Sequence, residues 1–186
     1  MSLPAGDSVI EVLDRAILAT FLYCGVRIGT ACRLTVNDFR DDADDPVLAI
    51  QEKGRAKSKR RIGIHSHCAE AIREYLTVSE IDRGPVFRAR LNSRSKKLGD
   101  KPISQPAMYR LLLDYLGQLR GSKDADGTCR YSPHSLRATT ATLLDEAGVP
   151  IKRIQELLGH KDIRVTQQYI KLLRDTKKSA SHDVPL

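Results

Sequence analysis

The strongest constraint on the fold comes from residues 132–169, which encode two consecutive helices with clear start and stop signals. Ser132 followed by Pro133 is typical of a helix start, because serine caps unpaired backbone N–H groups and proline is tolerated in the first turn. Apolar residues with helical spacing follow, and Gly148 and Pro150 end this helix and begin the next. This part of the chain is therefore predicted to form a helix, a tight turn and a second helix.

Four polar side chains in this stretch have no role in the helical pattern. They are His134, Arg137, His160 and Tyr169. His134 and Arg137 are three residues apart and share one face of the first helix. His160 directly follows the second helix, where a histidine can also serve simply as a cationic helix cap. Tyr169 taken alone fits a tyrosine at the edge of a core. Together, the four residues indicate a binding or catalytic site.

The charge distribution favours a polyanionic partner. The 186 residues contain 31 Lys and Arg against 23 Asp and Glu, a formal net charge of +8. Residues 53–61 carry six cations and no acid, and residues 88–101 carry six cations and one acid. Such clusters favour nucleic acid over a membrane, because no apolar run long enough to span one and no basic amphipathic helix is present. The side chains predicted to contact DNA are Arg55, Lys57, Lys59, Arg60, Arg94, Lys96 and Lys97.

The cysteines and histidines give no clear metal site. The four cysteines form no CxxC pair and are interpreted as reduced thiols of an intracellular protein. His65, His67 and Cys68 lack a fourth ligand nearby in the sequence, so we interpret them as polar residues at a strand-to-helix junction. We therefore expect neither a metal nor a cofactor.

The pattern of the whole chain predicts an α+β fold that is mostly helical, with a small antiparallel β-hairpin or sheet at one edge. The basic loop between the two hairpin strands is expected to form an exposed tip. Residues 88–101 are interpreted as a polar loop. Helices are expected over residues 8–24, 26–34, 66–79, 104–119, 132–147 and 150–158, a helical turn over 35–39, strands over 47–51 and 61–65, and a strand fragment over 85–87.

Two further polar residues stand out earlier in the chain, Arg27 beside Gly25 at a helix junction and Lys53 on the hairpin. Two arginines can hold the oxygens of a phosphodiester and stabilise the added charge of its transition state. Lysine can protonate a leaving alkoxide, histidine can relay a proton, and a tyrosine hydroxyl among cations can act as a nucleophile. No carboxylate pair of the kind that holds Mg²⁺ accompanies them, so the chemistry is expected to be metal-free.

In these residues the chain resembles the catalytic domain of the tyrosine recombinase (phage integrase) family over essentially its whole length. Any one of the matching motifs is weak evidence, whereas all of them in order with suitable spacing are specific. The motifs are Gly25-Val26-Arg27, Lys53-Gly54, His134-Ser135-Leu136-Arg137, Leu158-Gly159-His160 and Thr166-Gln167-Gln168-Tyr169.

The resemblance implies a site-specific recombinase or integrase that cuts and rejoins double-stranded DNA through a 3′-phosphotyrosine. Tyr169 would be the nucleophile, while Arg27, Arg137 and His160 would hold the phosphate. Lys53 would protonate the leaving 5′-oxygen, and His134 would assist proton transfer. No ATP would be needed, because the covalent link conserves the energy of the broken bond.

The resemblance also implies an assembly and a setting. Family members act as homotetramers on two DNA duplexes, so we expect a weakly associating or monomeric chain without DNA. Residues 1–172 would form the catalytic domain, and residues 173–186 a tail that docks on a neighbouring protomer. By the same resemblance, we expect the family's N-terminal DNA-clamping domain to be absent from this sequence. The setting implied is the cytoplasm, with the gene belonging to a prokaryote or a mobile element.

Three departures from the family pattern leave alternatives open. Thr30 stands where the family often has an acid, and Ala138 where it often has a second histidine. The hairpin is slightly long, so Lys57 competes with Lys53 as the general acid. Two other functions remain alternatives, a type IB topoisomerase that relaxes DNA alone and a DNA-binding module without catalysis.

Overall fold

The computed structural model describes residues 4, 6–42, 45–51, 58–92 and 94–174, with backbone alone for 171–174. In this part of the chain the fold is mostly helical with two small antiparallel sheets, which confirms the predicted α+β class. No helix in these segments is both long and apolar enough to cross a membrane. The elements are α1 (Val9–Cys24), α2 (Ile28–Ala31), η1 (Val36–Asp38), β1 (Phe39–Arg40), β2 (Val47–Ile50), β3 (Arg60–Gly63), α3 (Ser66–Val78), β4 (Arg88–Arg90), β5 (Leu98–Pro102), α4 (Gln105–Leu116), α5 (Pro133–Glu146), α6 (Ile151–Leu158) and α7 (Ile163–Arg174).

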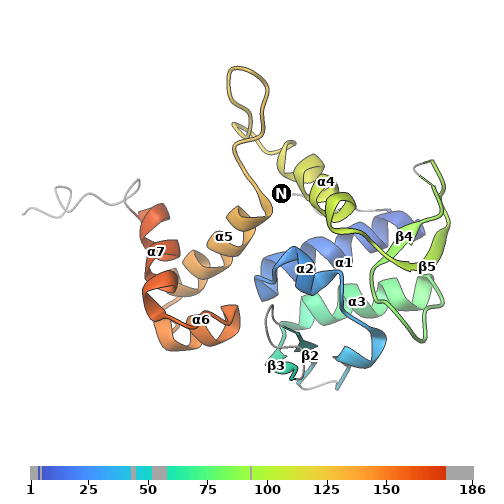
Figure 1. Cartoon of the computed structure of the whole chain (residues 1–186), viewed down its shortest axis with the longest axis horizontal. Helices are drawn as coiled ribbons and strands as arrows, with labels where there is room; N and C mark the ends of the chain where they lie inside the picture. Colours follow the sequence, from blue (N-terminus) through green and yellow to red (C-terminus); the bar gives the residue numbers. More distant parts are fainter. Residues whose placement is uncertain (1–3, 5, 43–44, 52–57, 93, 175–186) are drawn as a thin grey trace, which may run out of the picture.

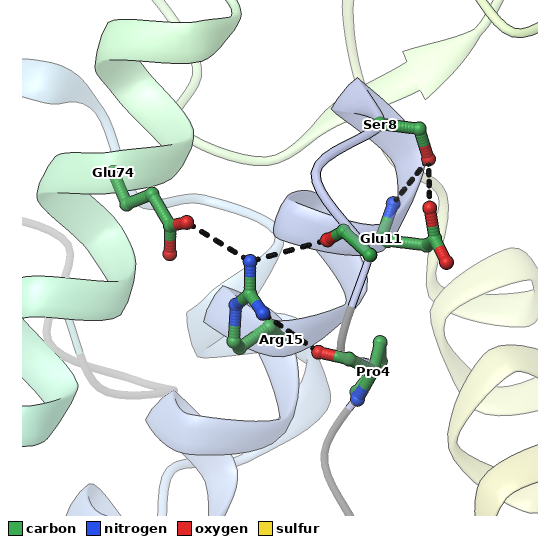
Figure 2. A network of polar contacts seen from close by, with 6 residues as sticks. Pro4, Ser8, Glu11, Arg15 and Glu74 are labelled. Carbon is green, nitrogen blue, oxygen red and sulfur yellow. Dashed lines mark hydrogen bonds and ion pairs between the residues drawn. The ribbon is translucent and has the colours of Figure 1, made fainter.

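Helix α1 forms the centre of the main core, because apolar residues cover most of its circumference and most of them are buried. Ser8 caps its N-terminus by accepting a hydrogen bond from the Glu11 backbone N–H. Figure 2 shows Arg15 of α1 between Glu74 of α3, at 2.9 Å, and the Pro4 carbonyl, at 2.7 Å. This side chain therefore ties α1 both to α3 and to the segment that precedes α1.

The predicted hairpin is confirmed by β2 and β3, which pair antiparallel with Leu48 opposite Ile62. Strand β1 extends the sheet on the other side of β2. It was not predicted, because the sequence there was interpreted only as the helical turn that η1 confirms. The pairing of this two-residue strand depends on β2 rather than on its own pattern.

The prediction of a loop over residues 88–101 is wrong, because β4 and β5 form a second antiparallel hairpin there. Their residues are half-buried or exposed, so neither strand shows the apolar alternation that predicts a strand. Neighbouring structure supplies the order instead. The Ile103 N–H donates to the Phe87 carbonyl at 2.9 Å, and Arg88 pairs with Asp100 across the hairpin at 2.9 Å.

The buried apolar residues form two separate clusters. The larger one gathers α1, the three-stranded sheet, α3, α4 and Leu136 of α5. The smaller one joins α5, α6 and α7 through Ala141, Ile154, Leu158 and Ile170. Helix α5 thus belongs to both clusters, and in Figure 1 α6 and α7 lie at one end of the long axis with the β4–β5 hairpin at the other. Four of the six predicted catalytic residues lie on α5, on α7 or directly after α6.

Candidate active site

The turn between α1 and α2 places Arg27. Gly25 ends α1 in the left-handed conformation with φ of 54°, where its N–H donates to the Phe21 carbonyl. A side chain would be strained at this φ, and its Cβ would come within 2.6 Å of Leu158 Cδ2. The turn therefore brings the end of α1 against the end of α6 and leaves Arg27 as the half-buried N-cap residue of α2.

Arg137 fixes the junction between the two clusters. The residue is only 3% exposed, and its guanidinium donates hydrogen bonds to the carbonyls of Gly25 and Leu158. Both carbonyls belong to helix C-terminal regions, where partial negative charge favours a cation. The Thr140 hydroxyl adds a second tie by donating to the Leu22 carbonyl of α1 at 2.7 Å.

A cavity of about 510 Å³ opens beside this junction and is lined by Arg27, His134 and Arg137. Thr30 and Arg33 of the α2 region and Tyr109 of α4 also line this cavity. His134 is exposed in the first turn of α5, whose N-terminus Ser132 caps through a capping box with Ser135. The predicted pair of arginines and one predicted histidine therefore do share a cavity suited to an anion.

His160 lies close to this wall from the side of α6. It follows Gly159, which ends α6 in the left-handed conformation, and it is 8% exposed. Its backbone N–H donates to the Gln155 carbonyl at 3.1 Å, and the Gln155 amide donates back to the His160 carbonyl at 2.9 Å. Burial, followed by the charges of Arg137 and Arg27, lowers the pKa of His160 to about 4. The ring is therefore neutral near pH 7, which excludes the alternative of a simple cationic cap.

Helix α7 places Tyr169 beside His160. The two rings have centroids 5.2 Å apart and planes inclined by 35°. One turn earlier on the same helix, the Thr166 hydroxyl lies 2.9 Å from His160 Nδ1. Tyr169 is partly buried and also packs against the smaller core cluster. It is thus both a residue at a core edge and a neighbour of the predicted phosphate-binding groups.

The predicted general acid Lys53, its competitor Lys57, and Arg55 lie outside the described residues. The last residue described before them, Gln51, is held close to Arg27. Its carbonyl accepts hydrogen bonds from Thr30 at 3.3 Å and from Arg33 at 3.1 Å. Thr30, where the family often has an acid, thus joins the α2 region to the end of β2.

A second cavity, of about 400 Å³, adjoins His160. We call it the basic pocket and define it by four cations, Arg60 and Arg61 of β3, Lys152 of α6 and Lys161. Glu156 is the one acid in its lining. Arg60 also donates to the Leu157 carbonyl at 3.1 Å, which joins the sheet to α6. Sequence reasoning missed Arg61, Lys152 and Lys161, although the position of Lys161 directly after His160 was an available signal.

The other residues predicted to contact DNA fall in two places. Lys59 pairs with Asp38 at 2.5 Å beside the three-stranded sheet. Burial opposes the charge of Asp38, but hydrogen bonds from Lys59 and Thr35 outweigh it and lower the pKa of the carboxyl. Arg94, Lys96 and Lys97 are exposed on the β4–β5 hairpin, which lies far from α7 (Figure 1). The structure therefore separates Arg94, Lys96 and Lys97 from the His160 site.

His65 and His67 lie at the start of α3, as predicted. The His65 ring stacks on Tyr23 with centroids 4.7 Å apart, and the Tyr23 hydroxyl lies 3.4 Å from His67 Nδ1. Within the described segments, no three His, Cys, Asp or Glu residues come together as a possible metal site.

Comparison with solved structures identifies the fold. The crystal structure of XerA recombinase superposes with a TM-score of 0.66 at 22% identity, over 97% of this chain and 60% of that one. The XerH site-specific recombinase bound to its difH substrate, in a pre-cleavage complex, gives 0.64 at 19% identity, over 95% and 47%. The fold is therefore that of tyrosine recombinase catalytic domains.

The sequence identifies the family. The model of the phage integrase family matches residues 4–176, so this chain belongs to that family, which confirms the resemblance. Tyrosine recombinase XerA of Thermococcus kodakarensis is 32% identical over 174 residues, covering 93% of this chain and 56% of the relative. Tyrosine recombinase XerC of Thermodesulfovibrio yellowstonii is 28% identical over 175 residues, covering 89% and 52%. The chain thus spans about half the length of these curated relatives.

Proposed function

We propose that this chain is the catalytic domain of a site-specific recombinase that cuts and rejoins double-stranded DNA through a 3′-phosphotyrosine. The observation that carries the proposal is the closeness of Tyr169 to a neutral His160, with ring centroids 5.2 Å apart, beside a cavity lined by Arg27 and Arg137. The family match supplies the reaction class, and the geometry supports the roles of the individual residues.

In the proposed reaction, the Tyr169 hydroxyl releases its proton to solvent and its oxygen forms a bond to phosphorus. The bond from phosphorus to the 5′-oxygen breaks, and that oxygen takes a proton from Lys53, with Lys57 as the alternative donor. Arg27 and Arg137 hold the charge that builds on the phosphate, and His134 assists proton transfer. Religation runs the same steps backwards with another 5′-hydroxyl, so no ATP is consumed. No step calls for a metal or a cofactor.

The basic pocket supports DNA as the substrate. A duplex whose scissile phosphate meets Arg27, Arg137 and His160 continues past His160, where Arg61, Lys152 and Lys161 lie. Cations in such a place neutralise neighbouring phosphates and release counterions, which gives affinity without base specificity. We also propose the homotetramer on two duplexes, with residues 173–186 docking on a neighbouring protomer.

A covalent-capture experiment tests the proposal without a known target site. The full chain is incubated with a pool of nicked duplexes of randomised sequence, in which the nick lets the short fragment that bears the new 5′-hydroxyl diffuse away. We expect wild type to yield a protein–DNA adduct that resists denaturant and maps to Tyr169. Tyr169→Phe should yield no adduct while binding the same pool with similar affinity.

The same materials separate the two alternatives. A type IB topoisomerase would relax a supercoiled plasmid that lacks any sequence enriched from the pool, whereas we expect no relaxation. A binding module without catalysis would retain DNA and give no adduct with any member of the pool. Such a result with a folded wild-type chain would rule out the proposed reaction.

A further inference from the structure

Thr166 forms a hydrogen bond within the site that the proposed reaction does not use. Its hydroxyl lies 2.9 Å from Nδ1 of His160, and the residue is 0% exposed. Among the hydrogen bonds of the described segments, this is the only one that the Thr166 hydroxyl makes. Thr166 also lies one helical turn before Tyr169, so it connects the histidine to the helix that holds the nucleophile.

The direction of this hydrogen bond follows from the burial of both groups. A neutral imidazole has one nitrogen that donates and one that accepts. The His160 ring is neutral near pH 7, since burial and the charges of Arg137 and Arg27 lower its pKa to about 4. If Nδ1 carried the proton, the Thr166 hydroxyl hydrogen would be buried without an acceptor, which is unfavourable. The hydroxyl therefore donates to Nδ1, and Nε2 carries the proton.

The tautomer decides what His160 can do. A protonated Nε2 can donate a hydrogen bond to a non-bridging phosphate oxygen, whereas an unprotonated Nε2 would present a lone pair to it. The general rule is that the partner of one imidazole nitrogen sets the role of the other. Thr166 thus keeps His160 in the tautomer that can donate a hydrogen bond to an anion.

We propose that Thr166 is a positioning residue, whose hydroxyl fixes His160 as the Nε2–H tautomer and aligns its ring beside Tyr169. The expected effect on cleavage rate rests on the proposed function. The tautomer of His160 can be tested independently of that function. If Thr166 only filled its buried position, a side chain of the same volume without a hydroxyl would serve equally well.

Three variants of the full chain test the proposal. Thr166→Val keeps the shape and removes the hydroxyl, whereas Thr166→Ser keeps the hydroxyl. The matched control is Thr20→Val, which removes another 0% exposed hydroxyl, whose hydrogen bond in the described part of the chain goes to the Ala16 carbonyl within α1. Single-turnover cleavage is measured on a nicked duplex enriched from the randomised pool. We expect Thr166→Val to lose on the order of 10- to 100-fold in cleavage rate, the range typical when the partner that orients a metal-bound histidine is removed, with DNA affinity unchanged.

The controls and a direct measurement make the outcome decisive. Thr166→Ser should recover most of the rate, and Thr20→Val should cleave like wild type. Nitrogen-15 NMR of the imidazoles should show the Nε2–H tautomer for His160 in wild type and a mixture in Thr166→Val. An Nδ1–H tautomer in wild type, or full cleavage by Thr166→Val, would overturn the proposal. If wild type itself forms no adduct, the proposed function fails, while the NMR result still decides the role of Thr166.

Discussion

At the scale of single residues, His160 is the side chain that the fold changes most. An exposed histidine has a pKa near 6.5, but burial and two nearby arginines lower the pKa of this one to about 4. The neutral ring can then approach Arg27, Arg137 and an incoming phosphate without adding charge repulsion to the two arginines. Because the buried ring resists protonation, the stability of the fold depends on pH.

We predict that His160 makes the free energy of unfolding fall as the pH is lowered from about 6.5 to about 4. In this window the unfolded chain binds a proton at His160 and the folded chain does not, so protonation favours unfolding. This loss of free energy of unfolding should be absent above pH 6.5 and should reach roughly 3 kcal/mol at most near pH 4. Urea unfolding across this range measures it.

The control for this prediction is His160→Gln, which cannot titrate. The variant should lose less stability than wild type over the same pH range, since the other titrating groups contribute equally to both proteins. Parallel curves for the two proteins would contradict the low pKa of His160.

At the scale of elements, the site depends on three helices whose ends meet. The C-terminal ends of α1 and α6 both present carbonyls to Arg137 of α5. Gly25 lets the end of α1 approach Leu158 of α6 more closely than any side chain would allow. The position of Arg27 relative to His160 therefore follows from how tightly these helix ends pack.

We predict that Gly25→Ala destabilises the fold more than Gly148→Ala does. Both glycines have positive φ, 54° and 76°, so each alanine should cost about 1–2 kcal/mol from backbone strain. A Cβ at Gly148 meets nothing within 4 Å, whereas one at Gly25 comes within 2.6 Å of Leu158 Cδ2. Overpacking there should add about 1–3 kcal/mol, measured by chemical denaturation.

A double variant identifies the source of the extra loss. Leu158→Ala removes the methyl group that the new Cβ would meet, so the cost of Gly25→Ala should be smaller in that background. Equal costs in both backgrounds would show that the close contact between α1 and α6 contributes nothing.

At the scale of the whole molecule, one site is assembled from two cores. The larger cluster carries Arg27, and the smaller one carries His160 and Tyr169 through α6 and α7. The predicted DNA contacts divide in a similar way, with the basic pocket beside His160 and Arg94, Lys96 and Lys97 on the β4–β5 hairpin (Figure 1). Binding measurements on each group of cations can show which part of the surface contacts DNA.

We predict that Lys152→Gln with Lys161→Gln weakens binding to a random-sequence duplex and reduces its salt dependence. Each lost phosphate contact should lower the slope of log affinity against log salt by about 0.9, so the pair should lower it by about 2. Fluorescence anisotropy over a series of salt concentrations measures both quantities. An unchanged slope would contradict the assignment of the basic pocket to the DNA backbone.

The β4–β5 hairpin supplies the comparison. Lys96→Gln with Lys97→Gln removes the same charge at the opposite end of the molecule from α7. A similar fall in slope would confirm the prediction from the sequence that these lysines contact DNA, and an unchanged slope would contradict it.

Local sequence patterns were enough to predict the helix ends and the residue types of the site. The helix ends are marked by Ser8, Gly25, Ser132 and Gly159. Each of these contacts residues only a few positions away, so local patterns suffice to locate the helix ends. The order and spacing of the motifs likewise indicated the family, and the match over residues 4–176 confirms it.

The way these parts act together depends on contacts between residues that are far apart in the chain. The carbonyl partners of Arg137 lie 112 and 21 residues away in the chain, and the β4–β5 hairpin forms because of its neighbours rather than its own pattern. The neutral state of His160, its bond to Thr166 and the basic pocket depend on burial and on distances between separate elements. Burial sets the local dielectric and packing sets the distances, and both belong to the folded chain rather than to any local stretch of sequence.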